Sequence, residues 1–213
     1  VKINLNRYTF DGKGIPTVEN DSAIEGEHSD WQELATGKGN TVAKSITDFK
    51  NSVTTNGGYY IGRYEARKNA SETITEVGID TIWNNINQPT AATKAQNMYD
   101  STHPFTSDLM NSYAWDTATL FLQSCGTNNK YSMQNSLNES LSQTGTTADK
   151  QCNVFDMASN VNEWTTETSS NSYYPCVNRG GYYIGSFYCP EYRGIHMPSD
   201  SFDSVGFRTL LYL

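Results

Sequence analysis

The sequence lacks clusters of basic residues and carries little charge of either sign. Charged side chains make up 18% of its 213 residues, and 23 acidic against 15 basic groups give a formal net charge of -8. Proteins that bind a nucleic-acid backbone neutralise its phosphates with grouped Lys and Arg side chains. We therefore expect no nucleic acid among the partners.

Long hydrophobic runs are absent as well. The apolar runs extend over only a few residues, whereas a membrane-spanning helix needs about 20, and the mean hydropathy is -0.62. The chain starts at Val1 and shows no basic-then-apolar leader. We expect no membrane insertion, and any targeting peptide to be absent or to lie outside this sequence.

The sequence has no closely spaced metal ligands and no hydrolase motif. It contains three scattered histidines and no Gly-x-Ser-x-Gly segment, which argues against a histidine facial iron site and against a serine hydrolase. The cysteines lie 27, 24 and 13 residues apart, at Cys125, Cys152, Cys176 and Cys189. This spacing fits neither a CxxC pair nor a structural zinc site. Two disulfides and four free thiols both remain open.

Uncharged polar residues are abundant instead. Asn, Ser and Thr number 21, 21 and 24, and a chain of this length still removes roughly 70% of its unfolded surface from water. We expect one domain over residues 1–213. Residues 1–40 are interpreted as a polar extension packed on it, and the Asn/Ser/Thr/Gln-rich residues 126–150 as a surface excursion.

Hydrophobic periodicity predicts two helices. Val42, Ile46, Phe49 and Val53 follow an i, i+4, i+7, i+11 pattern that ends before Gly57. A second helix is predicted after cap candidates at 106–108, and it closes near residue 125. We expect loops between the two helices, a strand at 59–65, and a small sheet with extensive loops after residue 151.

Four segments appear in an order that resembles one family. They are residues 58–65 (GYYIGRYE), residues 115–121 (WDTATLF), residues 160–165 (NVNEWT), and Arg179-Gly180-Gly181 with Gly206-Phe207-Arg208. Together they resemble the formylglycine-generating enzyme (sulfatase-modifying factor) family over about residues 57–210. The resemblance implies an α+β, C-type-lectin-like fold with two helices, a small, mostly antiparallel sheet and extensive loops.

The resemblance also indicates that the oxidase chemistry of this family is lost. Its enzymes hold copper with two cysteines of a Cys-x-x-x-x-Cys stretch, and soft thiolates suit Cu(I). Here Cys189 matches the first cysteine and Gly194 stands at the position of the second. We therefore expect no catalysis and no bound copper.

A structural calcium site is implied by the same resemblance. The matching stretch runs from Asp156 to Trp164. Asp156 and Glu163 would supply carboxylates, and Ser159 and Val161 main-chain carbonyls, which are the oxygen ligands that Ca²⁺ prefers. The alternative is a solvated acidic loop with Glu163 in a salt bridge.

Residues 179–208 resemble the variable region of proteins diversified by retroelements of phages and bacteria. Tyrosine mixed with short polar residues is also the composition of binding loops. The ligand-contacting residues implied by this resemblance are Tyr183, Ile184, Gly185, Phe187, Tyr188, Cys189, Tyr192, Gly194, Ile195 and His196. In this interpretation Cys189 is a product of diversification.

The sequence thus predicts a non-enzymatic ligand- or receptor-binding protein. We expect it on a virion or bacterial cell surface, or otherwise outside the cell, with a protein or glycan on a target cell surface as its ligand. Three alternatives remain: residues 182–205 as ordinary strand and turn packing, a copper-dependent formylglycine-generating oxidase, and a structural adaptor.

Overall fold

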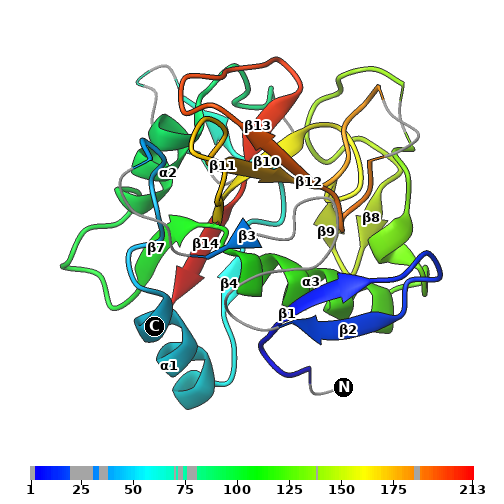
Figure 1. The fold of residues 1–213 in the computed structure, drawn as a ribbon, viewed down its shortest axis with the longest axis horizontal. Helices are drawn as coiled ribbons and strands as arrows, with labels where there is room; N and C mark the ends of the chain where they lie inside the picture. Colours follow the sequence, from blue (N-terminus) through cyan, green and yellow to red (C-terminus); the bar gives the residue numbers. More distant parts are fainter. Residues whose placement is uncertain are drawn as a thin grey trace.

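The computed structural model describes residues 3–19, 31–33, 38–69, 71, 74–75, 81–137, 139–184 and 188–213. Within these ranges the chain forms three α-helices, one 3-10 turn and several small sheets, an α+β arrangement as predicted (Figure 1). The helical elements are α1 (Ile46–Asn56), α2 (Gln88–Gln96), α3 (Ser112–Cys125) and η1 (Tyr131–Met133). None of the helices in the described ranges has the length and hydropathy needed to span a bilayer.

The prediction of two helices missed α2. Apart from Gln88, this helix buries only the small apolar side chains of Ala91, Ala92 and Ala95, so it lacks the hydrophobic stripe that marked α1. Its boundary signals were present, because Asn87 caps the first turn by accepting a hydrogen bond from Thr90 N. The region between the two predicted helices, which was expected to be a loop, therefore contains a third helix.

The predicted starts of the other two helices were also displaced. Residues 106–108 were expected to cap the second helix, but they lie in strand β7 (Thr106–Leu109). Asn111 is the actual cap of α3, and its side chain accepts from Ala114 N. Ser45 caps α1 in the same way by accepting from Asp48 N, so Val42 precedes the helix.

The largest sheet has the order β12-β11-β10-β13, with β3 paired to one end of β10. Its strands are β3 (Trp31–Gln32), β10 (Asn162–Ser169), β11 (Cys176–Arg179), β12 (Arg193–His196) and β13 (Val205–Phe207). All pairs are antiparallel except β10 with β13. The segment that joins β11 to β12 is therefore carried at the edge of this sheet.

A three-stranded sheet and three hairpins complete the strands of the described ranges. The sheet has the order β4-β14-β7, with β4 (Tyr60–Ile61) and β14 (Thr209–Tyr212). The strand predicted at 59–65 is thus shorter than expected. The hairpins are β1 (Arg7–Phe10) with β2 (Pro16–Glu19), β5 (Arg67–Lys68) with β6 (Ile74–Thr75), and β8 (Lys150–Gln151) with β9 (Val154–Phe155).

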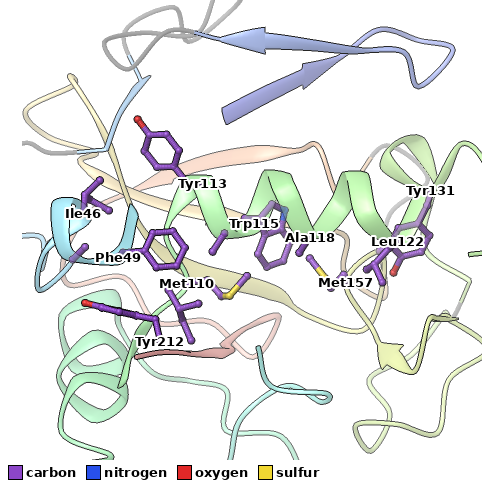
Figure 2. Packing of buried hydrophobic residues seen from close by; sticks show 14 residues of the cluster. Ile46, Phe49, Met110, Tyr113, Trp115, Ala118, Leu122, Tyr131, Met157 and Tyr212 are labelled. Carbon is purple, nitrogen blue, oxygen red and sulfur yellow. The ribbon is translucent and has the colours of Figure 1, made fainter. Parts of the chain in front are cut away.

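The main hydrophobic core surrounds α3. Figure 2 shows the buried Trp115, Leu122 and Met157 along this helix, and Phe49 and Tyr212 where α1 and β14 approach it. The rings of Phe49 and Tyr212 meet edge to face, with centroids 5.4 Å apart. A second core cluster joins the alanine face of α2 to the largest sheet, and contains Trp83, Trp164 and Phe207 among others.

Both polar segments singled out in the sequence contribute buried residues. In the N-terminal extension, β1 packs beside α3 (Figure 1), and Arg7 is fully buried. In the predicted excursion at 126–150, the hydroxyl of Tyr131 donates to Asp149 at 2.9 Å, and both side chains are buried. These anchors tie the two segments to the core, although much of 126–150 is exposed as expected.

Candidate functional site

Two glycines set the path of the chain as it leaves β11. Gly180 has a φ of +86°, and a Cβ there would lie 2.7 Å from the carbonyl oxygen of Met157. A Cβ on Gly181 would overlap the carbonyl group of Ala158. The chain therefore passes directly over the Met157–Ala158 backbone, an approach that only residues without a Cβ allow. These glycines fix where the following residues, 182–192, begin.

A buried cluster of five charged side chains lies beneath this segment. Arg179 donates to Asp116 at 2.6 Å and to Glu167 at 3.0 Å, and Arg193 donates to the same two carboxylates at 2.9 Å each. Arg7 adds a third guanidinium, 3.0 Å from Glu167. Arg179 and Arg193 stand at the two ends of the 180–192 connection, so the cluster binds both ends to the core.

The electrostatics of the cluster favour the charged form of Glu167. Burial alone would raise the pKa of this carboxyl group, but the guanidiniums of Arg193, Arg179 and Arg7 outweigh it and hold the pKa at about 2. Glu167 is therefore ionised at neutral pH. Three cations and two anions form one interdependent network in which each arginine relies on carboxylates for its neutralisation.

Further contacts fix the middle of the connection. Trp115 Nε1 donates to the carbonyl of Pro190 at 2.8 Å, and Glu191 N donates to the carbonyl of Ser132 at 3.1 Å. Arg179 Nε donates to the carbonyl of Tyr192 at 3.0 Å. Residues 190–192 are thus held by hydrogen bonds to α3, η1 and β11. The local backbone depends on these partners and not on a continuous strand.

Four tyrosines form a contiguous row on this frame. Ring centroids lie 6.0 Å apart for Tyr183 and Tyr182, 4.7 Å for Tyr182 and Tyr188, and 4.5 Å for Tyr188 and Tyr192. All four are partly exposed, and the neighbouring Ile184 is 64% exposed. We call these five residues the tyrosine row. Its rings present apolar area and hydroxyl groups together, which suits recognition.

The row continues toward the loop after β12. The hydroxyl of Tyr183 donates to Asp203 at 3.4 Å. The adjacent Phe202 lies 5.3 Å from the ring of His196, which also packs edge-on against Trp164 at 5.4 Å. Burial lowers the pKa of His196, although Asp200 opposes that shift. His196 is therefore mainly a packing residue at the margin of the row.

The predicted ligand contacts differ in accessibility. Six are at least partly exposed: Tyr183, Ile184, Tyr188, Tyr192, Ile195 and His196. Ile195 and His196 are consecutive in β12, so they point to opposite sides of the sheet and do not share one surface. Cys189 and Gly194 are buried, which leaves them little surface to offer a ligand. Gly185 and Phe187 lie outside the described residues.

Three accessible residues were missing from the prediction. Tyr182 belongs to the row through its contact with Tyr188, and Phe202 and Met197 are 39% and 41% exposed nearby. Tyr182 directly follows the Arg-Gly-Gly motif and lies within 182–205, but it was not among the ten ligand contacts that the resemblance implied. Phe202 and Met197 belong to the loop before the Gly-Phe-Arg motif, and no sequence pattern distinguished them from packing residues.

Exposed charge around the row is acidic. Arg193 is the one basic residue in 182–205, and the ion cluster buries it. Asp203 is exposed, and Asp200 and Glu191 are partly so. The surface therefore offers aromatic rings with carboxylates at its edge, which favours neutral or basic ligands.

A side chain at position 194 would require the neighbouring side chains of Asn178 and Tyr192 to move. A Cβ at this position would overlap the side-chain oxygen of Asn178 and would lie 3.1 Å from the ring of Tyr192. Burial, reinforced by Glu191, also raises the pKa of the Cys189 thiol, whereas copper binding requires a thiolate. Residues 189 and 194 therefore do not fit the two-thiolate copper site. The absence of catalysis itself stays a prediction.

The predicted calcium ligands have protein partners in this structure. Glu163 accepts from Arg208 at both oxygens, at 2.7 and 3.1 Å. Asp156 accepts from Gly145 N at 2.8 Å and from the hydroxyl of Thr147. Glu163 therefore forms the salt bridge of the alternative interpretation, but buried and not solvated. Both carboxylates are thus engaged by protein donors, and an ion would have to replace some of these hydrogen bonds.

Calcium binding stays a prediction that thermal unfolding tests directly. An ion that binds only the folded chain raises its stability, so the prediction expects a lower Tm in EDTA than in CaCl₂. Magnesium serves as the control, and Glu163→Gln should abolish the difference between the two buffers. Equal melting temperatures for the unmodified chain would contradict the prediction and leave Arg208 as the cation that partners Glu163.

A cavity of about 220 Å³ lies on another part of the molecule. Residues 60–67, Ile74, Thr209 and Leu211 line it, and none of them belongs to 179–205. The cavity is therefore separate from the tyrosine row.

Comparison with known proteins assigns the chain to a family. Residues 90–212 match the model of the sulfatase-modifying factor enzyme 1-like domain, which is more than half of the chain. No curated protein matches the chain. Among solved structures, Treponema denticola variable protein 1 is 14% identical with a TM-score of 0.43, and the match covers 100% of this chain and 94% of that one.

A second solved structure, CarF, is 17% identical with a TM-score of 0.38. The match covers 51% of this chain and 48% of CarF, so the chain spans about half the length of that protein. The family match extends over most of α2, α3, the strands β10 to β13 of the largest sheet, and β14, which together carry the second, third and fourth predicted motifs. The chain therefore belongs to the sulfatase-modifying factor enzyme 1-like domain family, with the C-type-lectin-like fold predicted from its motifs.

Proposed function

We propose that the chain is a non-enzymatic binding protein that recognises its ligand through the tyrosine row. The ligand is a protein or a glycan on the surface of a target cell, and the chain is displayed outside the cell, on a virion or a bacterium. The observation that carries this proposal is that the residues that hold the backbone are different from the residues that are accessible to a ligand. Glycines and a buried ion cluster hold the backbone at 179–181 and at Arg193, while the row stays accessible above it.

This separation favours diversification of the row. The bonds that hold the connection use main-chain atoms of residues 190–192 and side chains of Arg179 and Arg193, not the side chains of Ile184 or Tyr188. Replacement of the row residues therefore leaves these bonds in place. A protein whose ligand changes between variants needs such a division between constant and changeable positions.

The chemistry of the row also supports recognition. Tyrosine supplies large contact area with few rotatable bonds, so ordering it on binding costs little entropy. The buried, protonated Cys189 and the filled space at Gly194 give no support to the oxidase alternative. If the chain nevertheless converted a cysteine peptide to formylglycine when supplied with copper, the non-enzymatic assignment would be wrong.

A pair of libraries tests the proposal. One randomises Tyr183, Ile184, Tyr188 and Tyr192, and the other randomises exposed positions of α1, namely Thr47, Asn51, Thr54 and Thr55. Each is displayed on yeast and selected against two defined probes, the basic protein lysozyme and the glycan mannan. We expect both libraries to be displayed as folded protein, and binders to emerge mainly from the row library.

The stability of the selected clones provides the second measurement. We expect their Tm to lie within a few degrees of the starting chain, because substitutions of exposed side chains usually change stability by about 0.5 kcal/mol or less. Loss of display in the row library alone would show that 182–205 is ordinary packing. Binders at equal frequency in both libraries would show that the row has no special role.

A further inference from the structure

Two exposed cysteines flank a close contact between α3 and the β8–β9 hairpin. The side-chain oxygen of Gln151 lies against Gly126 and accepts a hydrogen bond from Thr127 N at 2.8 Å. Cys125, the last residue of α3, directly precedes this contact on one segment, and Cys152 directly follows it on the other. Both are exposed free thiols. The two thiols are distant in the sequence but thus lie on neighbouring surface segments.

Cys152 occupies an unusual backbone position. It and Asn153 form the two-residue turn between β8 and β9, with φ angles of 47° and 70°. Turns of this kind favour Asn and Gly, because a Cβ is unfavourable at positive φ. Residues kept in such conformations gather at sites where the side chain has a role. The position therefore points to a role for the thiol of Cys152.

Cys125 also lies close enough to Cys152 to affect the ionisation of its thiol. Burial raises the pKa of Cys152, and the neighbouring Cys125 raises it further. By contrast, Cys176 and Cys189 are buried. The surface pair is therefore distinct from the other two cysteines in both location and access to a soluble oxidant.

We propose that Cys125 and Cys152 form a disulfide bond when the chain meets an oxidising environment. In the first step, the thiolate of one cysteine attacks a small-molecule disulfide such as oxidised glutathione, forms a mixed disulfide and releases one glutathione thiolate. The thiolate of the second cysteine then attacks the protein sulfur and displaces the second glutathione. Two protein thiols thereby lose two protons and two electrons, and one oxidised glutathione becomes two reduced molecules.

The bond would close a ring around the segment that the sequence marked as an excursion. This ring contains η1 and the anchors Tyr131 and Asp149, whose side chains hold it to the core. A cross-link across a loop of this length restricts the unfolded chain more than the folded one. The proposal is independent of the ligand that the tyrosine row binds.

Mass spectrometry of the native chain tests the proposal. The chain is incubated in a mixture of reduced and oxidised glutathione, remaining thiols are alkylated, and the protein is digested. We expect a monomer that has lost about 2 Da, with one cross-linked peptide pair containing Cys125 and Cys152. Its Tm should exceed that of the dithiothreitol-treated chain by roughly 5 to 10 °C.

Single substitutions provide the controls. Cys125→Ser and Cys152→Ser should each abolish the cross-link and leave a glutathione adduct on the remaining cysteine. Cys176→Ser should leave the cross-link intact. Separate glutathione adducts on both cysteines, a dimer linked through either of them, or two unmodified thiols would each overturn the proposal.

Discussion

Glu167→Gln is expected to destabilise the chain by about 3 to 5 kcal/mol, because removal of one partner leaves buried charge uncompensated. Glu167 contacts three guanidiniums, and the substitution removes the charged carboxylate that Arg7, Arg179 and Arg193 share, while Asp116 still pairs with Arg179 and Arg193. Such a loss is a large fraction of a typical domain stability of about 5 to 15 kcal/mol. Urea unfolding at pH 7 measures it.

The same substitution at an exposed glutamate is the control. Glu139→Gln changes charge by the same amount on the surface, and we expect a change of about 0.5 kcal/mol or less. If Glu167→Gln also fell in that range, the buried cluster would not hold the 180–192 connection. Should Glu167→Gln fail to fold, the more conservative Glu167→Asp, which retains the charge, is expected to fold with a reduced Tm.

The stability difference between the unmodified chain and Glu167→Gln is expected to depend on pH. The folded pKa of Glu167, about 2, lies below the ordinary value of 4.5, so its ionisation stabilises the folded chain above pH 4.5. That contribution is lost as the pH falls from about 4.5 toward 2. The stability difference between the unmodified chain and Glu167→Gln should therefore shrink over this range. A difference that stays constant would contradict the pKa assignment.

Gly181→Ala is expected to destabilise the chain by about 3 kcal/mol or more, at the upper end of the cost of overpacking. The added Cβ would overlap the carbonyl group of Ala158 and lie 3.0 Å from the carbonyl oxygen of Tyr188, both of which are backbone atoms. Relief requires movement of β11 away from the 157–158 segment. Thermal unfolding, read by circular dichroism, measures the effect.

Gly58→Ala is the matched control, because a Cβ at Gly58 meets nothing within 4 Å. We expect its Tm to equal or slightly exceed that of the unmodified chain, since alanine reduces the freedom of the unfolded state. Equal stability of Gly181→Ala and Gly58→Ala would show that the Arg-Gly-Gly motif does not depend on close backbone approach.

The sequence predicted those parts of the fold that depend on local patterns or on complete motifs. The stripe of Ile46, Phe49 and Val53 located α1, and the order of four motifs located the family. The alanine face of α2 was missed because burial of small side chains against a sheet leaves little periodic contrast. Residues 106–108 have the composition of a helix cap, yet pairing with β14 places them in a strand.

For the candidate site too, the sequence predicted the motifs but not the contacts between distant residues. The tyrosine row directly follows the Arg-Gly-Gly motif, and Arg179 and Arg208 both belong to motifs that the sequence singled out. Their partners were not predictable, because Asp116 lies 63 residues from Arg179, and Glu163 lies 45 residues from Arg208. The sequence also did not show which side chains of the site are accessible to solvent. Cys189 and Tyr188 are consecutive, but only tertiary packing determines that one is buried and the other exposed.

The central claim is that a constant frame carries a changeable surface, and deep sequencing of this gene in a population of the cells or phages that carry it tests that claim most directly. The account predicts that amino-acid differences concentrate at accessible positions of the tyrosine row, while Arg179-Gly180-Gly181 and Gly206-Phe207-Arg208 stay unchanged. A uniform distribution of differences along the gene, or differences concentrated in these two motifs, would contradict it.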